Sequence, residues 1–300
     1  MNAPMKRPDF FIIGAPKCGT TSLDAWLGAH PRIFTAPKEP DYFNRDPGGM
    51  NNLRQYESLF AAASDAHLAV GETSPKYLRH PHAVGNILRY NDAAKFIVMV
   101  RNPADMAMSW HAQQLQNDNE DVRDFETAWN LQDKRRAGDA MPRLCYDTAN
   151  LLYGDVCALG KQLARVYEQA AREHVHVVVF DDVVADPGRV YRAVLKFLQT
   201  PDDGRTVFDA HNPGRLPRFR YLNRKLSDAH AKLAQVKTAL GIRHSFNSGA
   251  LLQRLKRLNS RADSRPRLRP EFRRALAEYF ADEVRLLESL LDRDLSHWRR

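Results

Sequence analysis

A short apolar run that passes directly into a glycine loop limits most strongly how this chain can fold. Residues 10–13 read FFII, and GAPKCG follows at 14–19. An apolar run of this length that ends at a glycine favours a fully buried strand. The next stretch, TTSLDAWLGAH, has the pattern of a helix that begins at Thr20 and stops before Pro31. Strand, tight loop and helix in this order open a βαβ unit, so the sequence predicts a parallel sheet.

Three further runs have the character of buried strands. They are LAVGETS at 68–74, AKFIVMVR at 94–101 and HVHVVVF at 174–180. A helix is predicted from Pro103, because proline suits the first helical turn, and a turn followed by a helix is predicted after residue 180. Long helical periodicity covers residues 149–171 and 271–291. The predicted fold class is α/β, with a P-loop-like central parallel β-sheet flanked by helices and a helical C-terminal part.

The chain of 300 residues is long enough for one large domain with an ample core. We expect a single domain over residues 1–300, with its core at about 8–200. A loop with several prolines and arginines is predicted at 202–222, and a polar, helical C-terminal part at 223–300. The sequence contains no internal repeat and no low-complexity tract.

Charge and cysteine content bear on the kind of ligand and on the cellular location. The formal net charge is +9, which favours an anionic ligand. Three cysteines, Cys18, Cys145 and Cys157, form no CxxC and no metal-ligand spacing, which indicates reduced thiols and a cytoplasmic location. The first apolar run is too short for a signal sequence or a membrane span, and no other segment is long enough to cross a bilayer.

The glycine loop departs from the nucleotide-binding pattern that it most resembles. A Walker A loop reads G-x-x-x-x-G-K-[ST], and Gly14 and Gly19 have that separation. Thr20 stands where the lysine belongs, and the lysine of the loop, Lys17, has moved to its middle. The backbone N–H groups of residues 17–22 and the helix dipole still predict an anion site, and the hydroxyl groups that follow Gly19 add donors.

The second strand indicates what kind of anion is bound. It runs into Arg101, whereas a nucleoside triphosphatase would need a metal-binding aspartate at such a strand end. Ser109 lies two turns into the next helix. The pattern favours a ligand with two separated phosphate-like groups and predicts no metal. Two structural alternatives remain: Arg101 could form an ion pair with Asp105, and Ser109 could be a small residue on a packed helix face.

Several motifs together resemble sulfotransferases that use 3′-phosphoadenosine 5′-phosphosulfate (PAPS). PKCGTTSL at 16–23 resembles their 5′-phosphosulfate loop, and FIVMVRNPADMAMSWH at 96–111 resembles their 3′-phosphate segment. Two stretches are similar to the heparan-sulfate type and its bacterial relatives: APKEPDYF at 36–43 and GETSPKYL at 71–78. VVVFDDVVADPGRVYRAVLKFL at 177–198 and LLDRDLSHW at 290–298 also have the look of this family.

The resemblance implies a role for each matched residue. The residues implied to bind the 5′-phosphosulfate are Lys17, Cys18, Gly19, Thr20, Thr21 and Ser22. Arg101 and Ser109 would bind the 3′-phosphate. Glu39 matches the catalytic base, with Lys38 beside it, and Lys17 would stabilise the leaving phosphate. Thr73 is a departure, because heparan-type enzymes often carry a lysine there; its contribution is either absent or supplied by Lys38 or Lys76.

The function implied is transfer of a sulfuryl group from PAPS to an acceptor hydroxyl, on a carbohydrate, a glycolipid or a small molecule. Glu39 is the expected general base, with His80 and His111 as alternatives. The alternative enzyme class is a P-loop kinase with a displaced lysine. A basic nucleic-acid-binding protein is disfavoured, because no motif of that class accompanies the charge. The acceptor, O- versus N-sulfation and the oligomeric state are not determined by the sequence.

Overall fold

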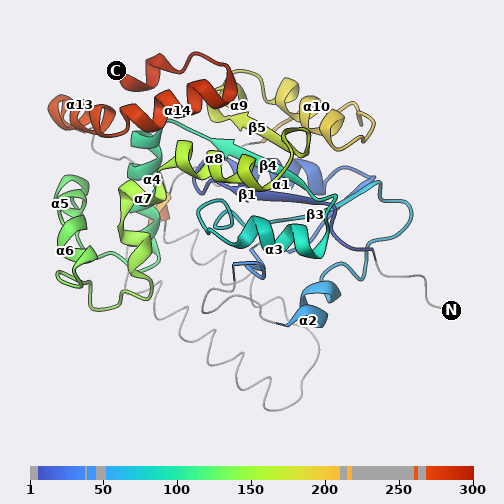
Figure 1. Cartoon of the computed structure of the whole chain (residues 1–300), viewed down its shortest axis with the longest axis horizontal. Helices are drawn as coiled ribbons and strands as arrows, with labels where there is room; N and C mark the ends of the chain where they lie inside the picture. The colour runs from blue at the N-terminus through green and yellow to red at the C-terminus, as the bar shows by residue number, and fades with distance from the viewer. Residues whose placement is uncertain (1–5, 38, 45–51, 210–214, 218–259, 263–267) are drawn as a thin grey trace, which may run out of the picture.

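A five-stranded parallel sheet forms the centre of the computed structural model (Figure 1). The structure describes residues 6–37, 39–44, 52–209, 215–217, 260–262 and 268–300, with backbone alone for 215–217 and 260–262. The strand order is β2-β3-β1-β4-β5. The strands are β1 (Phe10–Gly14), β2 (Ile33–Thr35), β3 (Ala69–Thr73), β4 (Lys95–Val100) and β5 (Val175–Val179). A separate antiparallel pair joins β6 (Arg215–Pro217) to β7 (Ser260–Ala262).

Strand β1 lies in the middle of the sheet, and all five of its residues are buried. It pairs with β3 on one side, where Ile12 lies opposite Thr73, and with β4 on the other. A continuous apolar run fits this position, because a central strand of a parallel sheet is covered on both faces. The pairing with β3 also needs a glycine: a Cβ at Gly71 would come within 2.5 Å of the ring and the carbonyl oxygen of Phe10.

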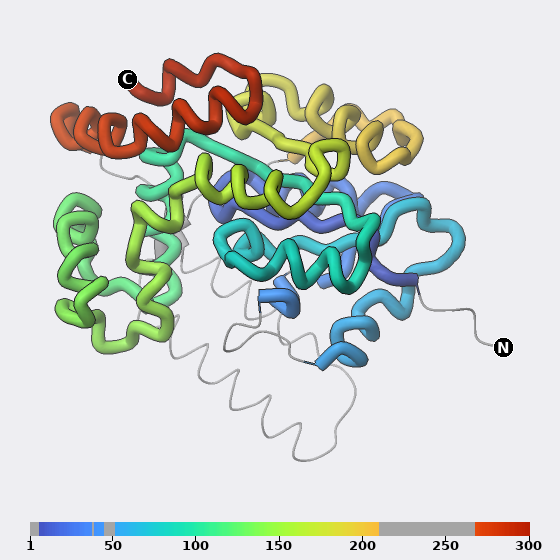
Figure 2. The backbone as a smooth tube through the Cα atoms, in the orientation of Figure 1, coloured from blue at the N-terminus to red at the C-terminus, as the bar shows by residue number. Residues whose placement is uncertain are grey.

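Helices cover both faces of the sheet. In Figure 1, α3 and α8 lie in front of it and α1 behind, while the C-terminal α13 and α14 lie along one edge of the molecule. The tube in Figure 2 shows α5 and α6 side by side at one end of the molecule, next to α4 and α7. The helices that precede α7 are α1 (Thr20–Gly28), α2 (Leu53–Ser58), α3 (Ala83–Tyr90), α4 (Pro103–Gln116), α5 (Phe125–Asn130), α6 (Gln132–Arg136) and the 3₁₀ turn η1 (Thr148–Leu151). The later ones are α7 (Tyr153–Val156), α8 (Leu159–Gln169), η2 (Arg172–His174), α9 (Phe180–Ala185), α10 (Pro187–Phe197), α13 (Pro270–Tyr279), α14 (Ala281–Leu291) and η3 (Ser296–Arg299).

The predicted fold class is confirmed, while several element boundaries differ from prediction. Residues 149–171 fold as three short pieces, and the helix predicted at 271–291 is broken at Phe280. The segment after β5, predicted as a turn, is the helix α9. Strand β2 was not predicted, because three residues are too few to show a periodicity. Of the predicted loop at 202–222, residues 210–214 and 218–222 lie outside the described residues, as do 223–259 of the predicted helical part.

Across the described part of the chain, every helix is too short or too polar to span a bilayer.

Candidate functional site

The carboxyl ends of β1, β3, β4 and β5 meet at one edge of the sheet. After β1 the chain passes through α1 to β2 and β3 on one side, and then crosses to β4 on the other side. Ligands in open α/β sheets bind where the strand order reverses in this way. The loop after β1 and the segment after β4 are therefore neighbours at the position where the fold favours a ligand.

The loop between β1 and α1 has the properties of an anion site. The amide of Ala15 donates to the carbonyl oxygen of Met99 at 2.7 Å, which fixes the loop to β4. Lys17 and Gly19 have left-handed backbone conformations, with φ of 65° and 93°. Helix α1 has no side-chain cap, and N–H groups in a first helical turn have no acceptor within their own helix. The amides of Thr20 and Thr21 are in this position, which suits them to an anion.

Two cations converge on this loop. The Lys17 ammonium donates to Gln113 Oε1 on α4 at 3.1 Å. Arg101 donates from Nη1 to the carbonyl oxygen of Lys17 at 3.3 Å, and its guanidinium lies over the ring of Phe180, 4.7 Å from the centroid. The structure therefore joins the two segments that the sequence suggested as separate phosphate sites.

The alternative pairing of Arg101 with Asp105 is wrong. Asp105 instead forms an ion pair with Arg273 of α13, at 3.2 Å. Within the described residues, no carboxylate forms an ion pair with Arg101. A guanidinium with a carbonyl and a ring as neighbours retains donors for an anionic ligand.

The other predicted loop residues differ in what their side chains face. The Cys18 thiol is fully buried, with its sulfur 3.8 Å from Met106 Sδ, and burial raises its pKa to about 12. Its side chain therefore belongs to the core, and its backbone is the part available to a ligand. Thr20, Ser22 and Ser109 are also buried, at 5%, 8% and 4% exposure, while Thr21 is half-buried.

Glu39 lies at the carboxyl end of β3, beside the loop. Its amide donates to the carbonyl oxygen of Thr73 at 2.9 Å, and Thr73 lies opposite Ile12 of β1. The residue is exposed and has a left-handed φ of 58°. Non-glycine residues in this conformation are uncommon and cluster at functional sites. Lys38, the other predicted catalytic residue from this segment, lies outside the described residues.

The side chains around Thr73 show what stands at the position of the heparan-type lysine. The Thr73 hydroxyl donates to Asp24 Oδ1 of α1 at 2.7 Å, and both residues are buried. Lys76, one of the two suggested substitutes for that lysine, forms an ion pair with Asp41 at 2.8 Å.

A buried carboxylate that sequence reasoning missed lies next to Thr73. Glu72 has no exposed surface and accepts hydrogen bonds from Tyr56, Tyr77 and Ser74 at 3.0, 3.0 and 2.7 Å. Desolvation raises its pKa to about 7, although these hydrogen bonds oppose the shift. Ser74 also accepts from the amide of Asp41 at 3.2 Å, so Glu72 helps to fix the segment that carries Glu39. All five residues of β3 are buried, so the strand pattern does not single out Glu72.

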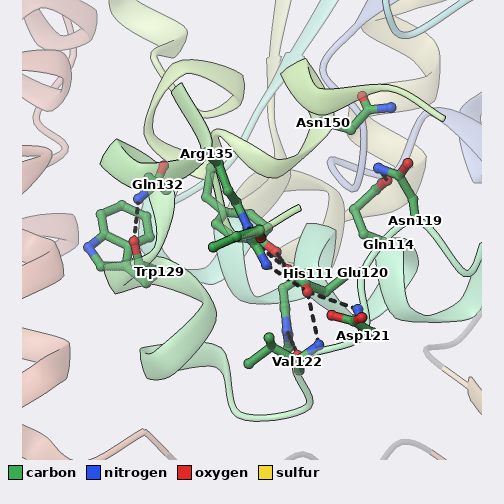
Figure 3. Close-up of polar contacts among 12 residues, drawn as sticks. His111, Gln114, Asn119, Glu120, Asp121, Val122, Trp129, Gln132, Arg135 and Asn150 are labelled. Atoms are coloured by element: carbon green, nitrogen blue, oxygen red, sulfur yellow. Dashed lines mark hydrogen bonds and ion pairs between the residues drawn. The ribbon is translucent and has the colours of Figure 1, made fainter. Parts of the chain in front are cut away.

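His111, one of the alternative bases, has a structural position in a buried polar network (Figure 3). Its Nε2 lies 2.9 Å from the carbonyl oxygen of Val122, and burial lowers its pKa. Beside it, Glu120 forms a bidentate pair with Arg135 at 2.7 and 2.9 Å, and both side chains are fully buried. Glu120 also accepts from the Tyr153 hydroxyl and from the amides of Asp121 and Val122. The network fastens the segment after α4 to the rest of the fold.

Asp181 and Asp182, which directly follow β5 in the sequence, could be expected to cap the next helix, but neither side chain does so. The side chain that caps α10 is Asp186, which accepts from the amide of Arg189. Asp182 instead pairs with Arg293. Asp181 Oδ2 accepts from Trp298 Nε1 and contacts His297 Nε2, both at 2.8 Å.

Trp298 also reaches the segment after β4. Its carbonyl oxygen accepts from Asn102 Nδ2 at 3.3 Å. The C-terminal turn η3 therefore joins the ends of β4 and β5, although it is separated from both by more than a hundred residues.

Comparison with known proteins identifies the family. The profile of the sulfotransferase domain matches residues 7–211, more than two thirds of the chain. The chain belongs to the sulfotransferase family. The structure of a sulfotransferase from Alicyclobacillus acidocaldarius is 26% identical, with a TM-score of 0.70, over 98% of this chain and 100% of that one. This agreement confirms the P-loop-like α/β architecture for this sulfotransferase.

Curated relatives include heparan sulfate glucosamine 3-O-sulfotransferase 5. The mouse (Mus musculus) protein is 25% identical to this sulfotransferase over 194 residues, and the human (Homo sapiens) protein 26%. Each match covers 65% of this chain and 54% of the relative, so this sulfotransferase matches about half the length of those proteins. The membrane-associated sulfotransferase kil1 of Dictyostelium discoideum is 32% identical over 108 residues, which are 34% of this chain and 22% of that protein.

Proposed function

We propose that this sulfotransferase transfers the sulfuryl group of PAPS to a hydroxyl group of an acceptor. The observation that carries the proposal is the bond from Arg101 to the carbonyl oxygen of Lys17. It brings a second cation, which has no ion-pair partner among the described residues, next to a strand–loop–helix anion site. A ligand with a 5′ and a 3′ phosphate group needs two such positions. A triphosphate chain with Mg²⁺ needs a lysine after Gly19 and a metal-binding aspartate.

The residues of this chain fit the donor. The amides at the start of α1, the hydroxyl groups of Thr20, Thr21 and Ser22, and the Lys17 ammonium would hold the 5′ group. Gly19 supplies the left-handed backbone conformation, with a φ of 93°, that leads from the loop into α1. Arg101 and Ser109 would hold the 3′-phosphate. PAPS supplies the sulfuryl group and leaves as the 3′,5′-bisphosphate, and we expect no requirement for a metal ion.

Glu39 is proposed as the general base, since an exposed carboxylate at the end of β3 can accept the proton of the attacking hydroxyl. Lys17 would stabilise the negative charge that develops on the leaving phosphate. Lys38 is a second candidate for that role, on the resemblance alone. This division of roles is supported by the adjacency of β1 and β3, which are hydrogen-bonded neighbours and therefore lie about 4.8 Å apart.

A hydroxyl on a sugar is the proposed acceptor, by analogy with relatives named as glucosamine 3-O-sulfotransferases. A small-molecule hydroxyl is the alternative. We propose a cytoplasmic location from the three free cysteines, Cys18, Cys145 and Cys157.

The experiment is calorimetric titration with adenosine 3′,5′-bisphosphate and with ATP, each with and without Mg²⁺. We expect metal-independent binding of the bisphosphate that is lost in Lys17→Ala and Arg101→Ala. Arg136→Ala is the matched control, because this arginine is half-exposed and its ion pairs among the described residues are with the surface carboxylates Asp133 and Asp155. Preference for Mg·ATP with no response to the bisphosphate would refute the proposal and favour the kinase alternative.

A transfer assay then addresses the acceptor. Labelled PAPS is incubated with a glucosamine-containing oligosaccharide and, separately, with a simple phenol. Transfer to the oligosaccharide supports the sugar acceptor, and transfer to the phenol alone contradicts it.

A further inference from the structure

The aromatic ring of Phe180 contacts both predicted phosphate-binding elements. On one side the guanidinium carbon of Arg101 lies 4.7 Å from its centroid. On another side is Gly19, where a Cβ would come within 3.2 Å of two ring carbons, Cδ2 and Cε2. Phe180 is the first residue of α9 and is half-buried. A single rigid ring therefore contacts both the loop after β1 and the arginine after β4, which also bond to each other directly through the Lys17 carbonyl oxygen.

Sheet register explains why Phe180 lies there. Val100, the last residue of β4, is opposite Val179, the last residue of β5. The residues that follow, Arg101 and Phe180, consequently leave the sheet side by side. An arginine over an aromatic face is attracted by the ring quadrupole, and its planar donors remain available at its edges.

The C-terminal turn η3 bonds to both of the segments that carry Phe180 and Arg101. Trp298 donates through Nε1 to Asp181, the residue after Phe180, at 2.8 Å. Its carbonyl oxygen accepts from Asn102, the residue after Arg101, at 3.3 Å. The residues that follow Phe180 and Arg101 therefore both bond to Trp298, and Phe180 and Arg101 contact each other. These contacts limit independent movement of the two segments.

We propose that Phe180 is a positioning residue that sets the spacing between the 5′ and 3′ phosphate sites. The inference rests on the proposed function, because it concerns ligands that carry both phosphates. The ring orients the Arg101 guanidinium and packs against Gly19, so that both sites engage one nucleotide at once. Loss of the Phe180 ring should therefore weaken the binding of a 3′,5′-bisphosphate much more than the binding of a nucleotide without the 3′-phosphate.

The test compares adenosine 3′,5′-bisphosphate with adenosine 5′-monophosphate by calorimetry in Phe180→Leu and Phe180→Tyr. Phe180→Leu removes the aromatic face, and we expect about a tenfold loss of affinity for the bisphosphate, as for a cation–π contact of moderate strength. Affinity for the monophosphate should change less than threefold. Phe180→Tyr keeps the ring and should retain the preference for the bisphosphate. Phe180→Met is measured alongside, so that a failure of the leucine variant to fold leaves a second ring-less protein.

Phe197→Leu is the matched control. Phe197 also lies under a cation, with the Lys95 ammonium 5.8 Å from its ring centroid, but Lys95 starts β4, about 20 Å along the strand from Arg101. This variant should bind both nucleotides as the wild-type protein does. A wild-type preference in Phe180→Leu and Phe180→Met, or equal losses for both nucleotides, would overturn the inference. Failure of the wild-type protein to bind the bisphosphate would instead refute the proposed function, and the inference with it.

Discussion

Replacement of Glu120 by glutamine should lower the free energy of unfolding by about 3–5 kcal/mol. The carboxylate and the Arg135 guanidinium are both completely buried and joined by two hydrogen bonds, at 2.7 and 2.9 Å. The glutamine variant keeps the shape but leaves a buried cation without its counter-charge, and removal of one member of such a pair costs about this much. For a chain of 300 residues the melting temperature should fall by roughly 5–8 °C. Urea unfolding followed by circular dichroism measures the free energy directly.

Two further variants separate this explanation from general damage. Glu120→Met combined with Arg135→Met removes both charges and should recover part of the loss, because paired apolar replacements are often close to neutral. Arg136→Gln, next in the chain, breaks exposed pairs with Asp133 and Asp155 and should cost less than 1 kcal/mol. If Glu120→Gln lowers stability by less than 1 kcal/mol, or if the double variant is no more stable than Glu120→Gln, the reasoning is refuted.

The same pair predicts a pH dependence. Desolvation raises the pKa of Glu120, but the hydrogen bonds from Arg135, Tyr153 and Val122 outweigh it and leave the pKa below its ordinary value. A carboxylate with a lowered folded-state pKa stabilises the protein above its unfolded-state pKa, and this contribution is lost as the pH falls through the folded-state value. Wild-type stability should therefore decline more steeply than that of Glu120→Gln below about pH 4.5.

Three further predictions concern the site and its supports. Glu39→Gln should lower kcat by about 10²–10⁴-fold while bisphosphate affinity stays within about twofold of the wild type; a matching loss of affinity would contradict a role as base. Glu72 binds its proton more tightly in the folded state, with a pKa of about 7, so its contribution to stability falls as the pH rises from about 4.5 to 7. Urea midpoints at pH 5 and pH 8 should therefore differ less in Glu72→Gln than in the wild type, and equal differences would count against it. Trp298→Phe removes the indole donor to Asp181 and should lower the free energy of unfolding by about 1 kcal/mol, whereas an unchanged urea midpoint would argue that the bond is not stabilising.

Local sequence patterns were sufficient for much of the fold. The run FFII predicted β1, and the apolar runs at 94–101 and 174–180 predicted β4 and β5. Proline at position 103 marked the first turn of α4, where Asn102 accepts from the amide of Ala104 at 2.9 Å. These features depend on residues close together in the chain, which is why a window of residues reveals them.

The breaks in the longer helices depend on contacts between distant residues. The periodicity of 149–171 is continuous, but the amide of Gly154 donates to Gln132 at 2.7 Å, and its Cα packs against Tyr279. Gly160 packs against Glu283 of α14 in the same way. Such approaches between elements set where a helix ends, and helical periodicity alone carries no record of them.

In the candidate site, too, some features follow from nearby residues in the sequence and others depend on contacts between distant residues. Gln113 could have been found from the sequence, because it follows Ser109 by four residues and so lies on the same helix face, but its bond to Lys17 joins residues 96 positions apart. Sequence reasoning missed Phe180 and Glu72. Phe180 becomes part of the site only through the register of β4 with β5, and Glu72 through tyrosines brought to it by α2 and the turn after β3.

By itself, the sequence determined the strand–loop–helix unit, the α/β class and the residues that match sulfotransferase motifs, because each is encoded within a short stretch. Tertiary structure alone decided that Arg101 bonds to the loop instead of to Asp105, that Asp181 contacts the C-terminal turn, and that Asp182 pairs with Arg293. A side chain with several possible partners selects among them by proximity. The register of the parallel strands and the return of the chain to them at Trp298 set that proximity.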